Sequence, residues 1–169
     1  AKENAQITFA SVQELSQETY NFMIKRGKAE TNANITWLDT CLGSKYSHLR
    51  IQTQLASQYA QAEAYNIYFN RGKQIFDMNT ESLHKVRNTS SNMLSRGVLT
   101  ENARTINQGK IRIEKHAKNC KAKQKSENLL IGEHARCDAV PILEVENDEV
   151  ICSHGASIGK LDEEKLFYF

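Results

Sequence analysis

One short stretch of the sequence, CSHGASIGKLDEE from Cys152 to Glu164, holds two groups of side chains that could do chemistry. Cys152 and His154 are two residues apart, and in a strand such residues share one face. Thiolates and imidazoles are the ligands that zinc ions and iron–sulfur centres use. Two ligands alone cannot close such a site, so another turn or a second chain has to contribute. The alternative is that Cys152 is a small packed hydrophobe, as free cysteines often are.

The second group is the glycine–lysine pair in the same stretch, which resembles part of a phosphate loop. A Walker loop has the pattern GxxxxGK[ST]. The segment from Gly155 to Lys160 has one residue too few between its glycines, and Leu161 stands where the magnesium-binding hydroxyl belongs. Such a loop could not wrap the phosphates, and the metal would lack its ligand. The sequence therefore predicts no nucleotide site on this chain.

The cysteine spacings offer a second route to a binding site. The chain has four cysteines and no CxxC motif, so neither a zinc ribbon nor a thioredoxin-type motif is available. Cys120, Cys137 and Cys152 follow one another at nearly equal intervals. This spacing could stack the three thiols on successive rungs of a repeating strand structure. No GxSxG nucleophile elbow occurs, so hydrolase chemistry is not predicted.

Alternation of apolar and polar residues predicts strands through most of the chain. NITWLDTCLG places Ile35, Trp37 and Asp39 on one face, and GKIRIEKHA alternates Ile111 and Ile113 with basic residues. A period of two is typical of half-buried strands. The expected strands recur at intervals of roughly 15 to 28 residues with little helix between them, which favours a solenoid of stacked rungs. The alternative explanation is that strand-like segments recur at these intervals by chance and do not form a repeat.

Several segments carry narrower expectations. The segment from Ser16 to Gly27 fits either a short helix or a strand. Pro141 is expected to open the ILEV strand, where a missing N–H costs no ladder hydrogen bond. Asp39 and Glu144 are expected on solvated strand faces, although both could be buried acids.

The sequence predicts two parts of unequal size. Residues 1–160 form the β-helix core, and residues 161–169 begin a C-terminal helical segment after a turn at Gly159-Lys160. Asp162 is the expected N-cap of this helix, because its side chain can accept a hydrogen bond from the first free N–H groups.

Composition excludes several classes of protein. Lys plus Arg number 22 and Asp plus Glu number 20, so the net charge is only +2. Seven basic residues alternate with other types in the segment 110–125, as on a solvated strand face, and we predict no nucleic-acid partner. No apolar run of about 18 residues and no secretory signal occur, so no membrane association is expected. The cysteines lack paired short spacings, which favours a reducing compartment.

Several stretches together resemble the SufB/SufD family of iron–sulfur cluster assembly proteins. They are HKVRNTSSNMLSRGVL, the GKIRIEK strand, NLLIGEHARCDAVPILEVENDEVICSHGASIG and the final LDEEKLFYF. WLDTCLGSK and the alternating Tyr/Phe strand fall where this family has comparable segments. The resemblance covers essentially the whole chain. Its C-terminal part is the most specific, since proline, acidic strand, CSHGAS and LDEE-aromatic occur in the family's order.

The resemblance implies a mainly β fold, a right-handed parallel β-helix. It also implies a scaffold component of a SufBCD-type complex rather than an enzyme, with ATPase activity on a separate SufC-type partner. The other partner would be a SufB-like subunit or a second copy of this chain, and an iron–sulfur cluster would be held transiently at their interface. The helices that contact the ATPase would follow Phe169. A cytoplasmic location is implied, with a plastid as the other option.

The site residues are also read from the resemblance. SufB-like chains resemble EHEATTS where this chain has CSHGASI, and Cys152 before His154 with Gly155 after it resembles the SufD-like branch. The resemblance implies that His154 and Cys152 bind iron or the cluster. SufB-like chains carry a cysteine at the position of Ala135, and Cys137 two residues on is a third candidate ligand. A purely structural β-solenoid that only docks other chains is the alternative function. A left-handed β-helix acyltransferase would need hexapeptide periodicity, which is absent.

Overall fold

The computed structural model describes residues 1–161, and every regular element in that range is a β-strand. One sheet contains β1 (Gln6–Gln13), β3 (Asn34–Cys41), β5 (Gln61–Asn70), β7 (Ser90–Thr100), β9 (Cys120–Ile131) and β11 (Val150–Leu161) in that order. The other contains β2 (Tyr20–Ala29), β4 (Tyr46–Leu55), β6 (Ile75–His84), β8 (Arg104–Ile113) and β10 (Arg136–Val145). We call them the odd sheet and the even sheet.

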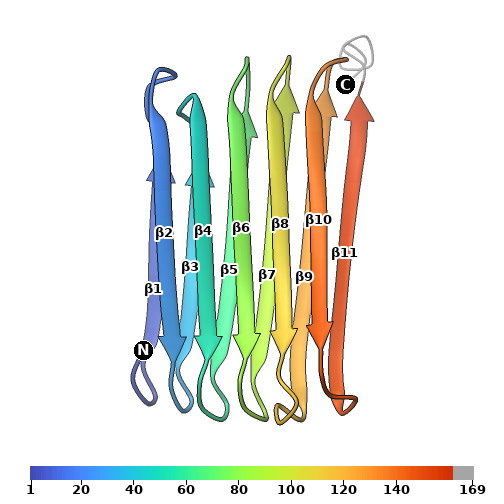
Figure 1. Cartoon of the computed structure of the whole chain (residues 1–169). Helices are drawn as coiled ribbons and strands as arrows, with labels where there is room; N and C mark the ends of the chain where they lie inside the picture. The colour runs from blue at the N-terminus through green and yellow to red at the C-terminus, as the bar shows by residue number, and fades with distance from the viewer. Residues whose placement is uncertain (162–169) are drawn as a thin grey trace.

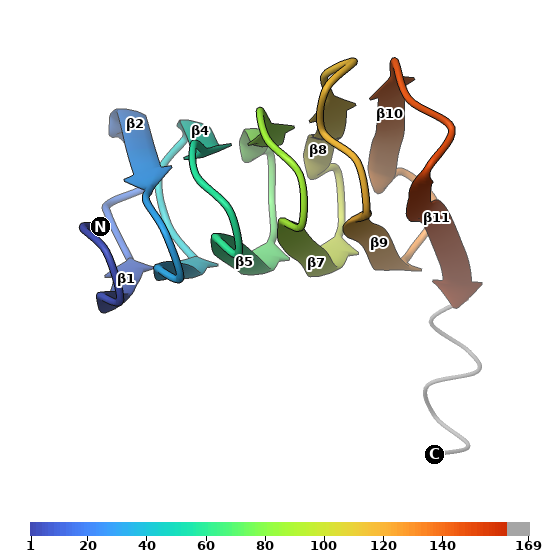
Figure 2. The same cartoon turned by 90° about the horizontal axis from the view of Figure 1, so that it is seen from below.

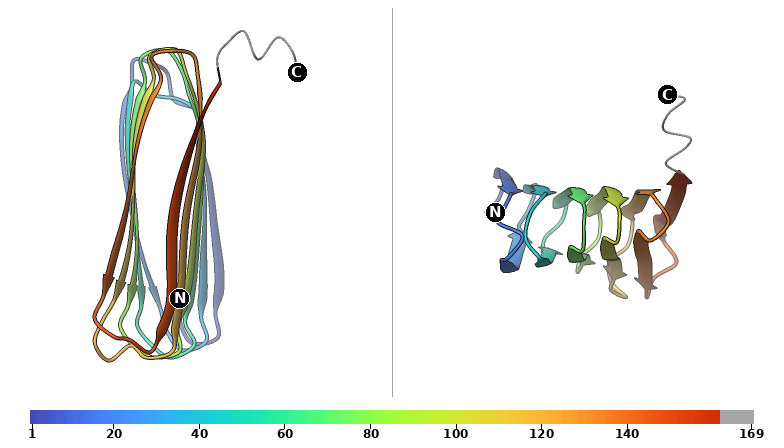
Figure 3. Two further views of the ribbon diagram at one scale, coloured as in Figure 1. Left: turned by 90° about the vertical axis from the view of Figure 1, so that its right-hand side faces the viewer. Right: turned by 90° about the horizontal axis from the view of Figure 1, so that it is seen from above.

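The two sheets are the walls of a parallel β-solenoid. Each strand pairs in parallel with the strand two places along the chain, so the polypeptide alternates between the sheets. The odd strands run in one direction and the even strands in the other (Figure 1). The views from below and along the solenoid axis show two facing layers joined by short corners (Figures 2 and 3). The mainly β solenoid fold predicted above is confirmed.

One full turn is longer than the strand spacing suggests. Ala62 lies beside Ser91, Ser91 beside Ala122, and Ala122 beside Cys152, in consecutive strands of the odd sheet. The number of residues between two such neighbours is about twice the number between the starts of two successive strands. Each turn therefore contributes one strand to each sheet, and residues half a turn apart in sequence lie on opposite walls.

Alanines and residues with a left-handed backbone conformation form the corners. Asn32, Asn88 and Asn119 adopt positive φ angles of 56°, 61° and 54° at the turns that lead into odd strands. Asparagine tolerates this conformation better than most residues because its side chain can hydrogen-bond locally. Fully buried alanines lie in the same kind of corner at positions 33, 60 and 117, and Ala103 lies in a corner that leads into the even strand β8. The chain thus turns sharply without leaving a void between the sheets.

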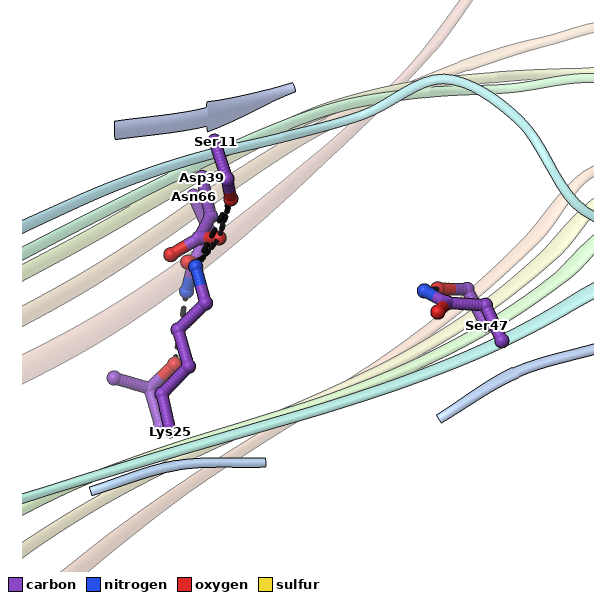
Figure 4. Close-up of polar contacts among 7 residues, drawn as sticks. Ser11, Lys25, Asp39, Ser47 and Asn66 are labelled. Carbon is purple, nitrogen blue, oxygen red and sulfur yellow. Dashed lines mark hydrogen bonds and ion pairs between the residues drawn. The ribbon is translucent and has the colours of Figure 1, made fainter. Parts of the chain in front are cut away.

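Polar side chains bridge the two sheets inside the solenoid. Lys25 of β2 reaches Asp39 of β3 and donates to the Ser11 hydroxyl of β1 at 2.9 Å (Figure 4). One turn further along, the Asn66 amide donates to the Thr80 hydroxyl across the interior at 2.8 Å. Buried polar groups of this kind need specific partners, so these bridges fix the register of one sheet against the other.

The Lys25–Asp39 pair corrects one expectation. Asp39 is not on a solvated face, because its side chain is only 4% exposed and that of Lys25 only 7%. The ammonium group also lies 4.3 Å from the centre of the Phe9 ring. The other acid behaves as expected, since Glu144 is exposed and pairs with Lys110 at 2.9 Å.

Three local predictions have different outcomes. The segment from Ser16 to Gly27 contributes to a strand, β2, and not to a helix. Pro141 does not open its strand but lies in the middle of β10, beside Gly109. It is tolerated there because, within residues 1–161, β10 is the last strand of the even sheet and its outer edge needs no N–H donor.

The end of the described chain also departs from expectation. No turn occurs at Gly159-Lys160, because β11 continues through both residues to Leu161 and pairs with β9 along its length. The helix expected from Asp162 lies outside the described residues, so the division at residue 160 stays a prediction. Within residues 1–161, no helix is long and apolar enough to cross a membrane.

Candidate functional site

Cys152 and His154 lie on the last strand of the odd sheet. Cys152 is beside Ala122 and His154 is beside Gln124, and both of these β9 residues are buried inside the solenoid. The two side chains therefore belong to the inward-facing rows, as the spacing of two residues predicts. Within residues 1–161 no strand covers the other edge of β11, so His154 is exposed and Cys152 is half-buried. The structure thus presents a thiol and an imidazole side by side at the open end of the solenoid.

The alternation of β11 keeps neighbouring residues away from this pair. Ile151 and Ser153 lie beside Lys121 and Lys123, in the outward-facing rows of the odd sheet. Ile151 is 71% exposed, while Cys152 packs against the edge of the apolar core. Substitutions at Ser153 therefore test the outer face without changing the inward one.

Cys137 lies in the even sheet, beside Thr105 near the start of β10. Burial raises the pKa of its thiol to about 11, although the hydroxyl of Tyr68 acts in the opposite direction. Tyr68 also hydrogen-bonds Asn128 two turns further along, inside the solenoid. The ring of Tyr68 occupies the space where a Cβ on Gly97 would stand, which explains the glycine at that inward position.

The structure does not bring Cys137 together with the other two candidates. Its neighbour Tyr68 meets Asn128, which lies beside Ile158. Ile158 is six residues beyond Cys152 on β11, a distance of about 20 Å along a strand. Cys137 is therefore near one end of the last turn, and Cys152 with His154 near the other.

The stacked-cysteine hypothesis is wrong for a related reason. Cys120 lies beside Val150 and Cys152 beside Ala122, both on the odd sheet, whereas Cys137 is on the opposite wall. Cys120 is completely buried, with the Thr89 hydroxyl at 3.2 Å and the Val86 carbonyl at 3.4 Å from its sulfur. A thiol in this position packs as a small hydrophobe with a weak hydrogen bond.

The sequence did not identify one buried titratable side chain, that of His84. Nδ1 of His84 lies 2.8 Å from the Thr89 hydroxyl, and Nε2 lies 2.8 Å from the Ser91 hydroxyl. Thr89 donates to the Val86 carbonyl, so it accepts from Nδ1–H, and Ser91 donates to Nε2. Burial lowers the pKa of His84 to about 4, which keeps the ring neutral. The only sequence signal was the polar segment Asn88–Gly97, whose composition cannot separate buried from exposed hydroxyls.

The arrangement defines what a single chain can bind. Among residues 1–161 no group of three or more His, Cys, Asp or Glu side chains is placed to hold a metal ion. Cys152 and His154 can offer one sulfur and one nitrogen, and zinc or iron–sulfur centres need more. A complete site of either kind would need further ligands besides these two, from outside residues 1–161.

Comparison with known proteins gives the class and then the family. The fold and the candidate site define a parallel β-solenoid with a thiol and an imidazole on β11. The chain matches a family model described as "SUF system FeS cluster assembly, SufBD core domain" over residues 1–169. The chain belongs to this family. The SufBD family protein ycf24 of Galdieria sulphuraria is 33% identical over 89% of this chain and 68% of its own length.

Two further relatives are much longer than this chain. The SufBD family protein of Mycobacterium leprae is 30% identical over 99% of this chain, which covers 19% of that relative. The SufBD family protein of Staphylococcus epidermidis is 28% identical over 98% of this chain, which covers 36% of that relative. The chain therefore spans about a fifth to a third of these two proteins.

Proposed function

We propose that this chain is a SufD-like scaffold of a SufBCD-type complex and that β11 forms part of the interface where a nascent cluster is built. The observation that supports this most directly is the position of Cys152 and His154. Both face inward on a strand whose outer edge is free in residues 1–161. A partner chain that covers this edge would bring its own ligands toward the same two side chains.

The chain's own contribution is to hold two ligands in a fixed direction. Alternate residues of a strand are about 7 Å apart at Cα, so the thiol and the imidazole reach one ion or two neighbouring ions. A neutral imidazole can bind iron, and a thiolate at Cys152 could hold iron. Pairing of β11 with β9 fixes the strand register, so the Cα–Cβ bonds of both residues point to the inward side.

The proposal assigns the remaining functions to other chains. ATPase activity would belong to a SufC-type subunit, since no phosphate loop is formed here, and the second scaffold would be a SufB-like subunit or another copy of this chain. Cys137 would not bind the same cluster, because it is about 20 Å along the last turn. The complex would act in the cytoplasm or in a plastid.

The test is anaerobic cluster loading of the assembled complex. The full-length protein is co-purified with its SufB-like and SufC-type partners and loaded with iron and sulfide, as wild type, His154→Ala and Cys152→Ala. Ser153→Ala is the matched control, because Ser153 faces outward on the same strand. We expect bound iron and sulfide to fall about tenfold or more in the His154 variant, less in the Cys152 variant, and not in the control.

Complex formation has to be measured in the same samples. Size-exclusion chromatography shows whether each variant still associates with its partners. Equal cluster content in all four proteins would contradict the ligand assignment and favour the second candidate, a docking module without metal chemistry. Normal association with a large loss of cluster in the His154 variant, a smaller loss in the Cys152 variant and none in the Ser153 control would support the assembly site.

A further inference from the structure

The outer face of β2 and β4 carries an exposed aromatic and aliphatic surface. Tyr20, Phe22 and Ile24 point away from the interior and are 60%, 69% and 63% exposed. Tyr46 of β4 lies beside them, with ring centres 5.7 Å from Phe22 and 6.5 Å from Tyr20. Large apolar side chains clustered in this way on a protein surface usually mark an interaction site. None of them is required for the core, which is formed by the alternate residues of the same strands.

The same face becomes basic further along the two strands. Arg26 and Lys28 continue the outward row of β2, and Arg50 of β4 lies directly beside Ile24. None of these three cations makes an ion pair with another residue in the described part of the chain. We call the whole surface the β2–β4 strip. It consists of Tyr20, Phe22, Ile24, Arg26, Lys28, Tyr46, His48 and Arg50.

The nearest outward-facing acids, Asp77 and Glu81, lie on β6, one strand beyond Arg50 and two strands beyond Arg26 and Lys28. Asp77 of β6 is occupied by His48, whose Nδ1 lies 2.9 Å away, and by the Asn79 amide at 2.8 Å. Glu81 accepts from the Gln52 amide at 2.8 Å. On β8 the basic residues are paired with acids of β10 or with Glu146 just after it, as in Lys110 with Glu144 at 2.9 Å. Both carboxylates keep their negative charge, but they lie two strands away from β2, so the Arg26–Lys28 end of the strip is a local positive surface on a chain that is almost neutral as a whole.

The dimensions of the strip match one polypeptide segment. Neighbouring strands are about 4.8 Å apart, and the eight steps from Tyr20 to Lys28 extend over roughly 27 Å. A groove of about 460 Å³ borders the strip and is lined by His48, Arg50 and Lys110 and by one acid, Glu81, among others. Carboxylate side chains could enter this groove and reach the unpaired guanidinium of Arg50. Asp77 and Glu81 limit the positive surface on the β6 side, which disfavours the continuous basic stripe that a nucleic-acid backbone needs.

We propose that the β2–β4 strip is a docking site for a partner-protein segment with an apolar half and an acidic half. The apolar half would cover Tyr20 and Phe22, and the Asp or Glu side chains would pair with Arg26, Lys28 and Arg50. Tyrosine, phenylalanine and arginine are the residues most enriched in protein interfaces and among their energetic centres. This site is at the opposite end of the solenoid from β11, so it is independent of the cluster ligands (Figure 1).

Fluorescence polarisation with a defined peptide tests the proposal. The probe is a labelled peptide with four alternating Leu and Phe residues followed by four Glu residues, added to the full-length protein in its complex. Phe22→Ala and Arg50→Glu are the strip variants. Ile67→Ala and Lys123→Glu are matched controls, because both residues are exposed on the odd sheet. Each strip variant should weaken binding about tenfold, and the controls should stay within about twofold.

Changes in the peptide's charged residues and in the salt concentration supply the remaining tests. A peptide with Lys in place of Glu should not bind, and added salt should weaken binding of the acidic peptide. The proposal is overturned if the acidic peptide does not bind, or if strip and control variants lose affinity equally. Strip-dependent binding of a single-stranded oligonucleotide or of phosphatidylglycerol vesicles in preference to the peptide would equally overturn it. Thermal unfolding of each variant confirms that the substitution leaves the fold intact.

Discussion

Protonation of His84 should destabilise the fold between about pH 6.5 and pH 4. The ring is completely buried, and its two nitrogens bond the hydroxyls of Thr89 and Ser91. Burial lowers the pKa of His84 from 6.5 to about 4. In the window between these values the unfolded chain binds a proton that the folded chain does not. Stability from this group is therefore fully present above pH 6.5 and is lost as the pH falls toward 4.

The size of the effect follows from the shift. Each pKa unit corresponds to 1.36 kcal/mol, so a lowering of about 2.5 units gives roughly 3 kcal/mol across the window. This is a large part of the 5–15 kcal/mol by which domains of ordinary size are stable. His84→Gln should remove this pH dependence. It should also cost about 1–3 kcal/mol at neutral pH, because one hydroxyl loses its partner.

Urea unfolding at a series of pH values measures both effects. The fluorescence of Trp37 is a suitable probe, because this single tryptophan is buried in the same interior. Wild type, His84→Gln and the exposed-site control His116→Gln are compared, so that titration of surface carboxylates cancels in the difference. The control should follow wild type at every pH. An equal slope of stability against pH in wild type and His84→Gln would refute the argument, since no titrating group would then have been removed.

Three further predictions concern the interior. Lys25→Met should cost roughly 3–5 kcal/mol, because it leaves Asp39 as an unpaired buried charge, and the double variant with Asp39→Leu should recover much of this in urea unfolding. Gly97→Ala should destabilise the fold by about 1–3 kcal/mol, because the new Cβ would overlap the Tyr68 ring. An additional Tyr68→Leu change should restore stability, and a double variant as unstable as Gly97→Ala would contradict that cause. Cys137, with its pKa raised to about 11, should react with iodoacetamide at pH 8 far more slowly than glutathione, as followed by mass spectrometry; equal rates would contradict the burial argument.

The strand pattern was predictable because it depends only on local alternation. Ile35, Trp37, Ile111 and Ile113 are buried on one face of their strands, as the period of two requires. The same alternation placed Asp39 inward, but a carboxylate is rarely buried without a partner. That partner, Lys25, is on the opposite sheet, so the pairing depends on how the walls face each other. Local sequence does not contain that information.

The predicted stacking of the three cysteines was wrong for a different physical reason. The spacing between successive cysteines covers only half a turn, so Cys137 is on the opposite wall from Cys120 and Cys152. The full stacking period, which is twice as long, becomes visible only when the strand register is known. Cys152 and His154 were predicted correctly as neighbours, because their relation lies within one strand and needs no knowledge of the turn length.

The position of a residue along the solenoid axis decides whether an inward side chain can function. Inward residues of inner strands, such as Ala122 and Gln124, are covered by strands on both sides and can only pack or bond one another. Cys152 and His154 occupy the same rows but have a strand on one side only within residues 1–161. Inward direction keeps the pair oriented, while the uncovered edge keeps it accessible to another chain. Under the proposed function, this combination is the physical reason why β11 would suit an interfacial site, whereas the same two residues one turn earlier would be buried in the core.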